Sequence, residues 1–214
     1  MVKTIRKNHL PVKLVCLLAI ALLAPLAHAS ILGNGGSAPP SPLFPTGTLV
    51  ASTSGTITTA TFSDAYAQWV YADPNNTWCS GCLDFVYQFT NNGPDAQARF
   101  SMYNFVGFLV DAGTNPFGVH DPLTVDRSAL GPVIAFNYAG SEIVPGETTP
   151  LLVIETNALY FTSGFASAQD GTAGYGFAYA PASTVPEPSS LALIGGGVSV
   201  FGVMLRKFRF GKSV

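Results

Sequence analysis

The sequence predicts an all-β domain, best described as an antiparallel β-sandwich, between two apolar terminal segments. Three observations indicate this fold class. Apolar residues between the terminal segments alternate with polar ones or form short runs, and Gly, Pro, Asn and Asp separate these runs. No stretch between them shows the 3.6-residue period of an amphipathic helix, so a parallel α/β sheet is disfavoured. A closed β-barrel is the alternative that fits the same pattern.

The predicted strands are rich in Thr, Val, Ile and aromatic residues, which suit a pleated surface. They cover Thr48–Thr53, Thr56–Phe62, Ala67–Tyr71, Leu83–Thr90, Arg99–Val110, Leu123–Asp126, Val133–Tyr138, Leu151–Thr156, Ala158–Phe161 and Tyr175–Tyr179. Gly107 is expected to form a bulge or kink within its strand. Turn residues at Asn91–Pro94, Pro145-Gly146 and Asp170-Gly171 separate neighbouring strands.

Composition divides the chain between its termini into three parts. Residues 30–47 are rich in Gly, Pro and Ser and are expected to form a flexible or partly extended lead-in. The folded domain is expected over residues 48–181, a length that allows a substantial core. Residues 182–214 form the C-terminal tail, in which Ala182 to Thr184 are a short linker after the domain.

The N-terminal 29 residues have the composition of a signal peptide. Basic residues up to Lys13 precede an apolar segment from Leu14 to Leu26, and Ala27 and Ala29 supply the small residues that signal peptidase requires. We expect cleavage by that partner enzyme before Ser30, which also removes Cys16. The apolar segment is short for spanning a bilayer, although a retained N-terminal anchor is the alternative.

The C-terminal tail carries three features in a fixed order. Pro186-Glu187-Pro188 comes first, an apolar segment from Leu191 to Leu205 is second, and Arg206-Lys207-Phe208-Arg209 ends the pattern. This order resembles the PEP-CTERM sorting signal of Gram-negative bacteria. The resemblance implies that an exosortase recognises the Pro-Glu-Pro motif and removes the tail, and that the domain before it is an exported β-rich domain of uncharacterised function.

The apolar segment of the tail suits a removable signal. Its fifteen residues are marginal for a transmembrane helix, and four of them are glycines, which destabilise helices relative to alanine. The basic end is expected to stay in the cytoplasm, which leaves the domain outside the inner membrane. A permanent single-span anchor is the alternative. The expected final location is the cell envelope, cell surface or extracellular matrix.

Charge is distributed unevenly along the chain. The region from Ser30 to Glu187 holds all twelve acidic residues but only two basic ones, Arg99 and Arg127, which gives a net charge of −10. Such a surface repels nucleic acid and anionic lipid, so we expect no nucleic-acid partner. The charge either favours solubility or attracts cations or neutral polar ligands.

Cys79 and Cys82 are the two cysteines of the exported domain. With Trp78 they form a W-C-x-x-C pattern that resembles thioredoxin-like redox sites. Those sites place the first Cys at a helix N-terminus, whereas Leu83–Thr90 is predicted here as a strand. We therefore expect a structural disulfide across a tight loop. Zinc is disfavoured because two thiolates need two further ligands.

The polar residues reveal no catalytic centre, cofactor site or metal site. His120 lies in a predicted loop, and the nucleophile motif of serine hydrolases is missing. Asp121, Asp126 and Arg127 form the densest charged patch, without the spacing of a calcium loop. Arg127 is expected to have a structural role by pairing with a carboxylate. The acidic residues still permit a pair of glycosidase carboxylates.

Aromatic residues are frequent, and most are expected to pack in the core or on sheet faces. An exposed row of them would stack on sugar rings. The ten that we consider are Tyr66, Trp69, Tyr71, Trp78, Tyr87, Tyr103, Tyr138, Tyr160, Tyr175 and Tyr179.

These features support three hypotheses for function. The first is a non-enzymatic surface or matrix protein, which the sorting signal associates with exopolysaccharide and biofilm. The second is a carbohydrate-binding module that uses an exposed Trp, and the third is a secreted glycan hydrolase.

Overall fold

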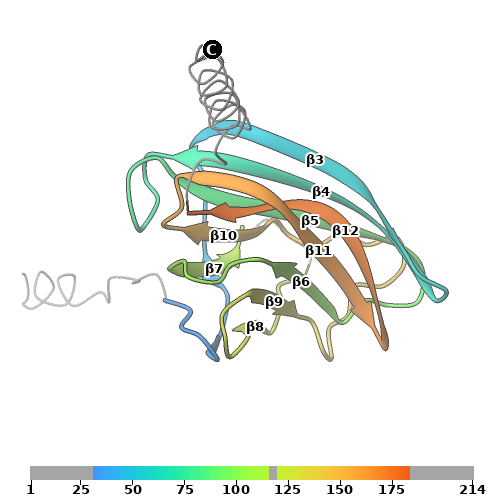
Figure 1. Ribbon diagram of the computed structural model, residues 1–214. Helices are drawn as coiled ribbons and strands as arrows, with labels where there is room; N and C mark the ends of the chain where they lie inside the picture. Colours follow the sequence, from blue (N-terminus) through green and yellow to red (C-terminus); the bar gives the residue numbers. More distant parts are fainter. Residues whose placement is uncertain (1–30, 116–119, 184–214) are drawn as a thin grey trace, which may run out of the picture.

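The computed structural model describes residues 31–115 and 120–183, which fold into two six-stranded β-sheets packed face to face (Figure 1). No helix occurs within these residues, and the two sheets do not close into a barrel. The predicted all-β fold is therefore confirmed, and the sandwich is the form it takes. The predicted signal peptide with Ala27 and Ala29, the Pro186-Glu187-Pro188 motif and the apolar segment 191–205 lie outside the described residues.

Sheet A has the order β2-β7-β10-β5-β4-β3, with one parallel pair, β2 and β7. Its strands are β2 (Ser41–Pro42), β7 (Val110–Thr114), β10 (Leu152–Thr156), β5 (Cys82–Pro94), β4 (Phe62–Asp73) and β3 (Thr48–Thr58). Sheet B has the order β1-β8-β9-β6-β11-β12 and is antiparallel throughout. Its strands are β1 (Ser37–Ala38), β8 (Thr124–Arg127), β9 (Val133–Asn137), β6 (Arg99–Tyr103), β11 (Tyr160–Asp170) and β12 (Thr172–Ala182).

The core lies between the two sheets and results from strict alternation along the strands. In β4, every second residue from Phe62 to Val70 is buried against sheet B, while the residues between them are half-buried on the other face. Aromatic and aliphatic side chains of both sheets meet in this space, with the rings of Phe89 and Phe100 stacked 4.4 Å apart. A smaller apolar cluster of Leu43, Val86 and Val153 covers the outer face of sheet A.

The chain crosses from one sheet to the other at a point where a single strand is predicted. Residues Arg99–Val110 are not one strand, because β6 ends at Tyr103 in sheet B and β7 begins at Val110 in sheet A. Asn104 and Gly107 have positive φ angles of 74° and 85°, which turn the chain between the two. The predicted kink at Gly107 is thus part of a crossover and not a bulge.

The expected flexible lead-in is also corrected by the structure. Residues 37–38 and 41–42 form β1 and β2, which extend sheets B and A at one edge. Leu32 packs into the main core and Leu43 into the smaller cluster. The Gly- and Pro-rich composition conceals these contacts because each strand is only two residues long.

Side chains from sheet A hold the last strand of sheet B. Gln68 donates from Nε2 to the carbonyl of Tyr179 at 2.8 Å and accepts from the Tyr179 amide at 2.6 Å. Tyr66 donates to the carbonyl of Phe177, and Tyr87 to that of Tyr179. The amide of Gln68 therefore replaces a neighbouring strand at the free edge of β12. Gly176 allows this approach, because a Cβ there would lie 2.6 Å from the Tyr66 ring.

Candidate functional site

The outer face of sheet B carries a row of polar side chains across four strands. Thr124, Asn137, Arg99 and Gln169 are successive cross-strand partners on β8, β9, β6 and β11. Direct partners point to the same side of a sheet. That side is the outer one, because the alternate residues of these strands, such as Phe100 and Phe136, lie in the core. We call these four residues with Asp126 and Ser101 the polar row.

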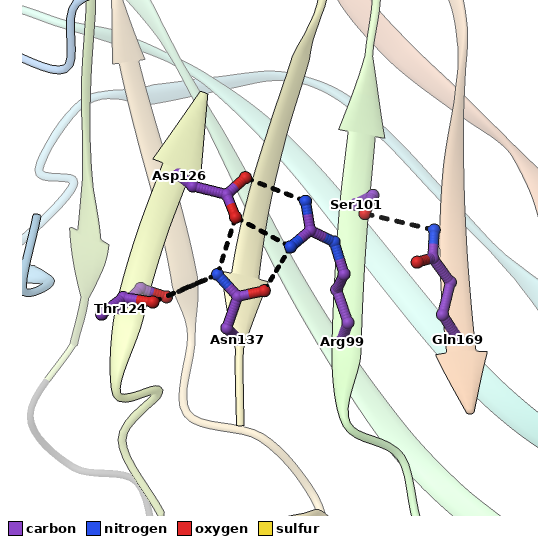
Figure 2. Close-up of polar contacts among 6 residues, drawn as sticks. All are labelled: Arg99, Ser101, Thr124, Asp126, Asn137 and Gln169. Carbon is purple, nitrogen blue, oxygen red and sulfur yellow. Dashed lines mark hydrogen bonds and ion pairs between the residues drawn. The ribbon is translucent and has the colours of Figure 1, made fainter. Parts of the chain in front are cut away.

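Hydrogen bonds fix the side chains of the polar row in place (Figure 2). The Arg99 guanidinium donates to both oxygens of Asp126 at 2.8 Å and to the Asn137 Oδ1. Asn137 in turn donates to Asp126 Oδ2 at 2.9 Å and to the Thr124 hydroxyl at 3.2 Å. The side chains of Arg99 and Asp126 are 34% and 29% exposed, so a ligand in solvent can reach them.

Four aromatic side chains occupy the same outer face beside the polar row. Phe165 and Phe177 are direct cross-strand partners, while Tyr103 and Tyr175 have ring centroids 5.8 Å apart. Tyr175 is 59% exposed, Phe165 54% and Phe177 44%. We call these four residues the aromatic strip. Exposed apolar side chains that lie together on one face are a common feature of binding surfaces.

The polar row and the aromatic strip have complementary chemistry. Aromatic rings offer flat apolar surface that packs on the carbon face of a sugar ring. The guanidinium, amide and hydroxyl groups next to them donate to and accept from hydroxyl groups. Because sheet register sets the spacing of both groups, the face is organised before any ligand binds. The arrangement can bind a ligand that carries both apolar surface and hydroxyl groups.

The predicted charged patch is not brought together by the structure. Asp126 points outward and pairs with Arg99, whereas Arg127 points into the sandwich and is 6% exposed. Its guanidinium donates to the carbonyls of Leu32, Phe105, Phe108 and Gly131. The expected carboxylate partner of Arg127 was therefore wrong, because alternation along β8 separates adjacent residues onto opposite faces.

His120 and Asp121 lie in a loop with separate partners. His120 Nε2 is 3.1 Å from Glu147 Oε1, and Thr114 donates to Asp121 Oδ1 at 3.1 Å. Although exposure to solvent opposes any large shift, the amide of Val144 and then His120 hold the pKa of Glu147 below its usual value. Across residues 31–115 and 120–183, no three His, Cys, Asp or Glu side chains lie close enough together to hold a metal ion.

Cys79 and Cys82 are joined by a disulfide with Cα atoms 5.3 Å apart. The bond closes the loop before β5, and Cys82 is the first residue of that strand. The helix that a thioredoxin-like site requires after its cysteines is replaced here by a strand. The fold therefore gives this pair a structural setting.

Neither tryptophan is the exposed ring that the carbohydrate-binding hypothesis expected. Trp69 and Trp78 are half-buried, and Trp69 packs on the apolar cluster outside sheet A. Tyr66, Tyr87 and Tyr138 belong to the core. The exposed rings include Phe165 and Phe177, which the sequence reasoning missed. Their alternation with Gly and Ala from 164 to 178 was the available signal, since small residues mark the inner face of both strands.

Comparison with known proteins identifies the tail and nothing else. Residues 184–209 match the family described as the PEP-CTERM protein-sorting motif, which includes Pro186, Glu187 and Pro188. No curated protein and no solved structure matches the chain. The motif implies a protein of Gram-negative bacteria that is exported and sorted by an exosortase. In residues 31–115 and 120–183, no helix is long and apolar enough to cross a membrane.

Proposed function

We propose that this exosortase-sorted chain is a non-enzymatic surface protein that binds neutral polysaccharide through the outer face of sheet B. The observation that carries the proposal is the aromatic strip beside the hydrogen-bonded polar row. Sorting to the cell envelope brings such a face into contact with extracellular polysaccharide. The domain then acts as a component of the matrix around the cell, in a biofilm or a similar layer.

The charges favour a neutral ligand. Arg99 is neutralised by Asp126 on the face itself, with two charge-assisted hydrogen bonds of 2.8 Å. The exported region as a whole is strongly acidic, with two basic against twelve acidic residues. An acidic polysaccharide would be repelled by this field, particularly at low ionic strength.

Hydrolysis is less well supported than binding. Glycosidases use two carboxyl groups on either side of the scissile bond. The polar row contains one carboxylate, Asp126, and both of its oxygens accept hydrogen bonds from Arg99. A carboxylate held in this way orients a neighbouring cation and is a poor proton donor or nucleophile.

Affinity electrophoresis in gels containing the host's own exopolysaccharide tests the proposal. We expect the polysaccharide to retard the native chain, and Tyr175→Ala to weaken binding by about tenfold, equivalent to about 1.4 kcal/mol for one lost stacking contact. Phe44→Ala is the matched control, because Phe44 is 50% exposed but lies outside the strip. If no neutral glycan retards the chain, or if both variants bind alike, the proposed face is wrong.

A further inference from the structure

Four carboxyl side chains form a line across the outer face of sheet A. Glu155 on β10 is the direct cross-strand partner of Asp84 on β5 and of Asp111 on β7. Asp73, at the end of β4, extends the line, since its carboxyl group lies within hydrogen-bonding reach of that of Asp84. All four are buried, with Asp84 and Asp111 fully inaccessible. We call these four residues the carboxyl row.

Two segments of chain cover the carboxyl row and are bound to it. The first is the strap, residues 41–46, in which Ser41 donates to Asp111 at 3.2 Å and the Thr46 amide donates to Asp73 at 2.8 Å. The second is the disulfide loop, residues 74–81. There Asn76 donates to Asp84 at 2.7 Å, and the Thr77 amide donates to Glu155 at 3.3 Å.

The groups that face the row from the strap, the disulfide loop and the neighbouring strands are hydroxyls, amides and other carboxyls. Among the described residues, Arg99 is paired with Asp126, His120 with Glu147, and Arg127 with backbone carbonyls. No basic side chain in this part of the chain therefore compensates the row. Cross-strand partners lie about 5 Å apart, so four ionised carboxylates here would repel each other strongly.

The burial of these four carboxyl groups is explained if some of them are protonated. Asp84 Oδ2 and Asp111 Oδ2 are buried and accept no hydrogen bond. Two carboxylates cannot hydrogen-bond to each other, whereas a protonated Asp84 can donate to Asp73. Burial, and secondarily the charge of Glu155, raise the pKa of Asp84 to about 8, and burial raises that of Asp111 to about 6. Burial acts to raise the pKa of Asp73, but hydrogen bonds from Thr46 and Asn75 outweigh it and lower this pKa below its usual value. Asp73 therefore keeps its negative charge.

We propose that the carboxyl row is a pH-sensitive latch, which holds the strap and the disulfide loop on sheet A while protonated and releases them when its protons leave to solvent. The direction of the pH dependence follows from the burial of neutral carboxyl groups. The folded, latched state binds more protons than the open state, so latching is favoured at low pH and lost as the pH rises through about 6 to 8. Deprotonation of Asp84 and Asp111 adds negative charges to a row that already carries the negative charges of Asp73 and Glu155.

Hydrogen exchange of the native chain, measured from pH 6 to pH 9 and corrected for the intrinsic rate, tests the latch. We expect protection of residues 41–46 and 74–81 to fall by about 10- to 100-fold over this range relative to the protection of β11 and β12, which reports the stability of the whole domain. Asp84→Asn should abolish the fall, because its amide never ionises. Glu155→Gln should move the fall to lower pH, because removing the negative charge between Asp84 and Asp111 lowers the pKa of both carboxyl groups.

Asp121 lies outside the row, so Asp121→Asn should show the same dependence of protection on pH as the native chain. Protection that does not vary with pH in the native chain would overturn the proposal. So would an unchanged profile in both Asp84→Asn and Glu155→Gln. A third arm adds 1 mM CaCl2 at pH 8, roughly a saturating level for a weak extracellular site. Recovery of protection by Ca²⁺, but not by NaCl of equal ionic strength, would assign the row to a metal ion in place of protons.

Discussion

Replacing Asp64 with asparagine should flatten the dependence of the domain's stability on pH. Asp64 lies on the inner face of β4, between its cross-strand partners Ile57 and Asn91. It is fully buried, and neither of its carboxyl oxygens accepts a hydrogen bond. Asn91 does not donate to Asp64, because its side-chain amide already donates to the carbonyls of Asp95 and Ile143. Desolvation by burial therefore raises the pKa of Asp64 to about 7.

The size of the effect is set by proton linkage. Between its ordinary pKa of 3.8 and about 7, Asp64 binds a proton in the folded but not in the unfolded chain. Its contribution to the free energy of unfolding is therefore complete at low pH and falls by about 1.4 kcal/mol for each pH unit across this window. From pH 5 to pH 8 the loss is about 3 kcal/mol, equivalent to about 10 °C in Tm for a domain of this size.

Urea unfolding, followed by tryptophan fluorescence at pH 5, 6, 7 and 8, measures this difference. Asp84 and Asp111 titrate in the same range, but they contribute equally to the native chain and to Asp64→Asn. The gap between the two curves therefore isolates Asp64. Asp95→Asn is the control, because Asp95 is exposed. Parallel curves for the native chain and Asp64→Asn would refute the reasoning that a neutral carboxyl is buried there.

Three further substitutions test the packing of the sandwich by their effect on Tm. Gly176→Ala places a Cβ 2.6 Å from the Tyr66 ring and should cost about 1–3 kcal/mol, whereas Gly33→Ala meets nothing within 4 Å and should be nearly neutral. Arg127→Met leaves three buried carbonyls and one partly buried carbonyl without their donor, and we expect a loss of about 3 kcal/mol or more, or no soluble protein. Cys79→Ser opens the short disulfide loop and should cost about 2 kcal/mol, which disappears when both proteins are compared under reducing conditions.

Local sequence pattern was sufficient to predict the fold class and most of the strands. Leu83–Thr90 lies inside β5, and its alternation places Phe85, Tyr87 and Phe89 in the core. The same pattern could not show that Arg99–Val110 divides between two sheets, because alternation is identical in either sheet. The turn at Asn104 depends on a positive φ angle. Asparagine tolerates this angle, but an asparagine in the sequence does not predict it.

Register, and not local pattern, determines the two polar faces. Asp84, Asp111 and Glu155 are far apart in the chain, and only the pairing of β5, β10 and β7 puts them in one line. Arg99 and Asp126 meet in the same way across β9, although Arg127 was the adjacent and more obvious partner. Sequence reasoning counted the acidic residues of this region but could not assign their neighbours, since strand order was unknown.

The hydrogen bonds that tie β12 to sheet A have a mechanical consequence. β12 is the last strand of the described residues and ends at Ala182, and the sorting motif begins shortly after it at residue 184. Tension on the tail therefore enters the domain through this strand. Gln68, Tyr66 and Tyr87 tie the β12 backbone to sheet A, while the hairpin with β11 ties it to sheet B. The pull is divided between both layers of the sandwich, so the domain resists peeling of β12.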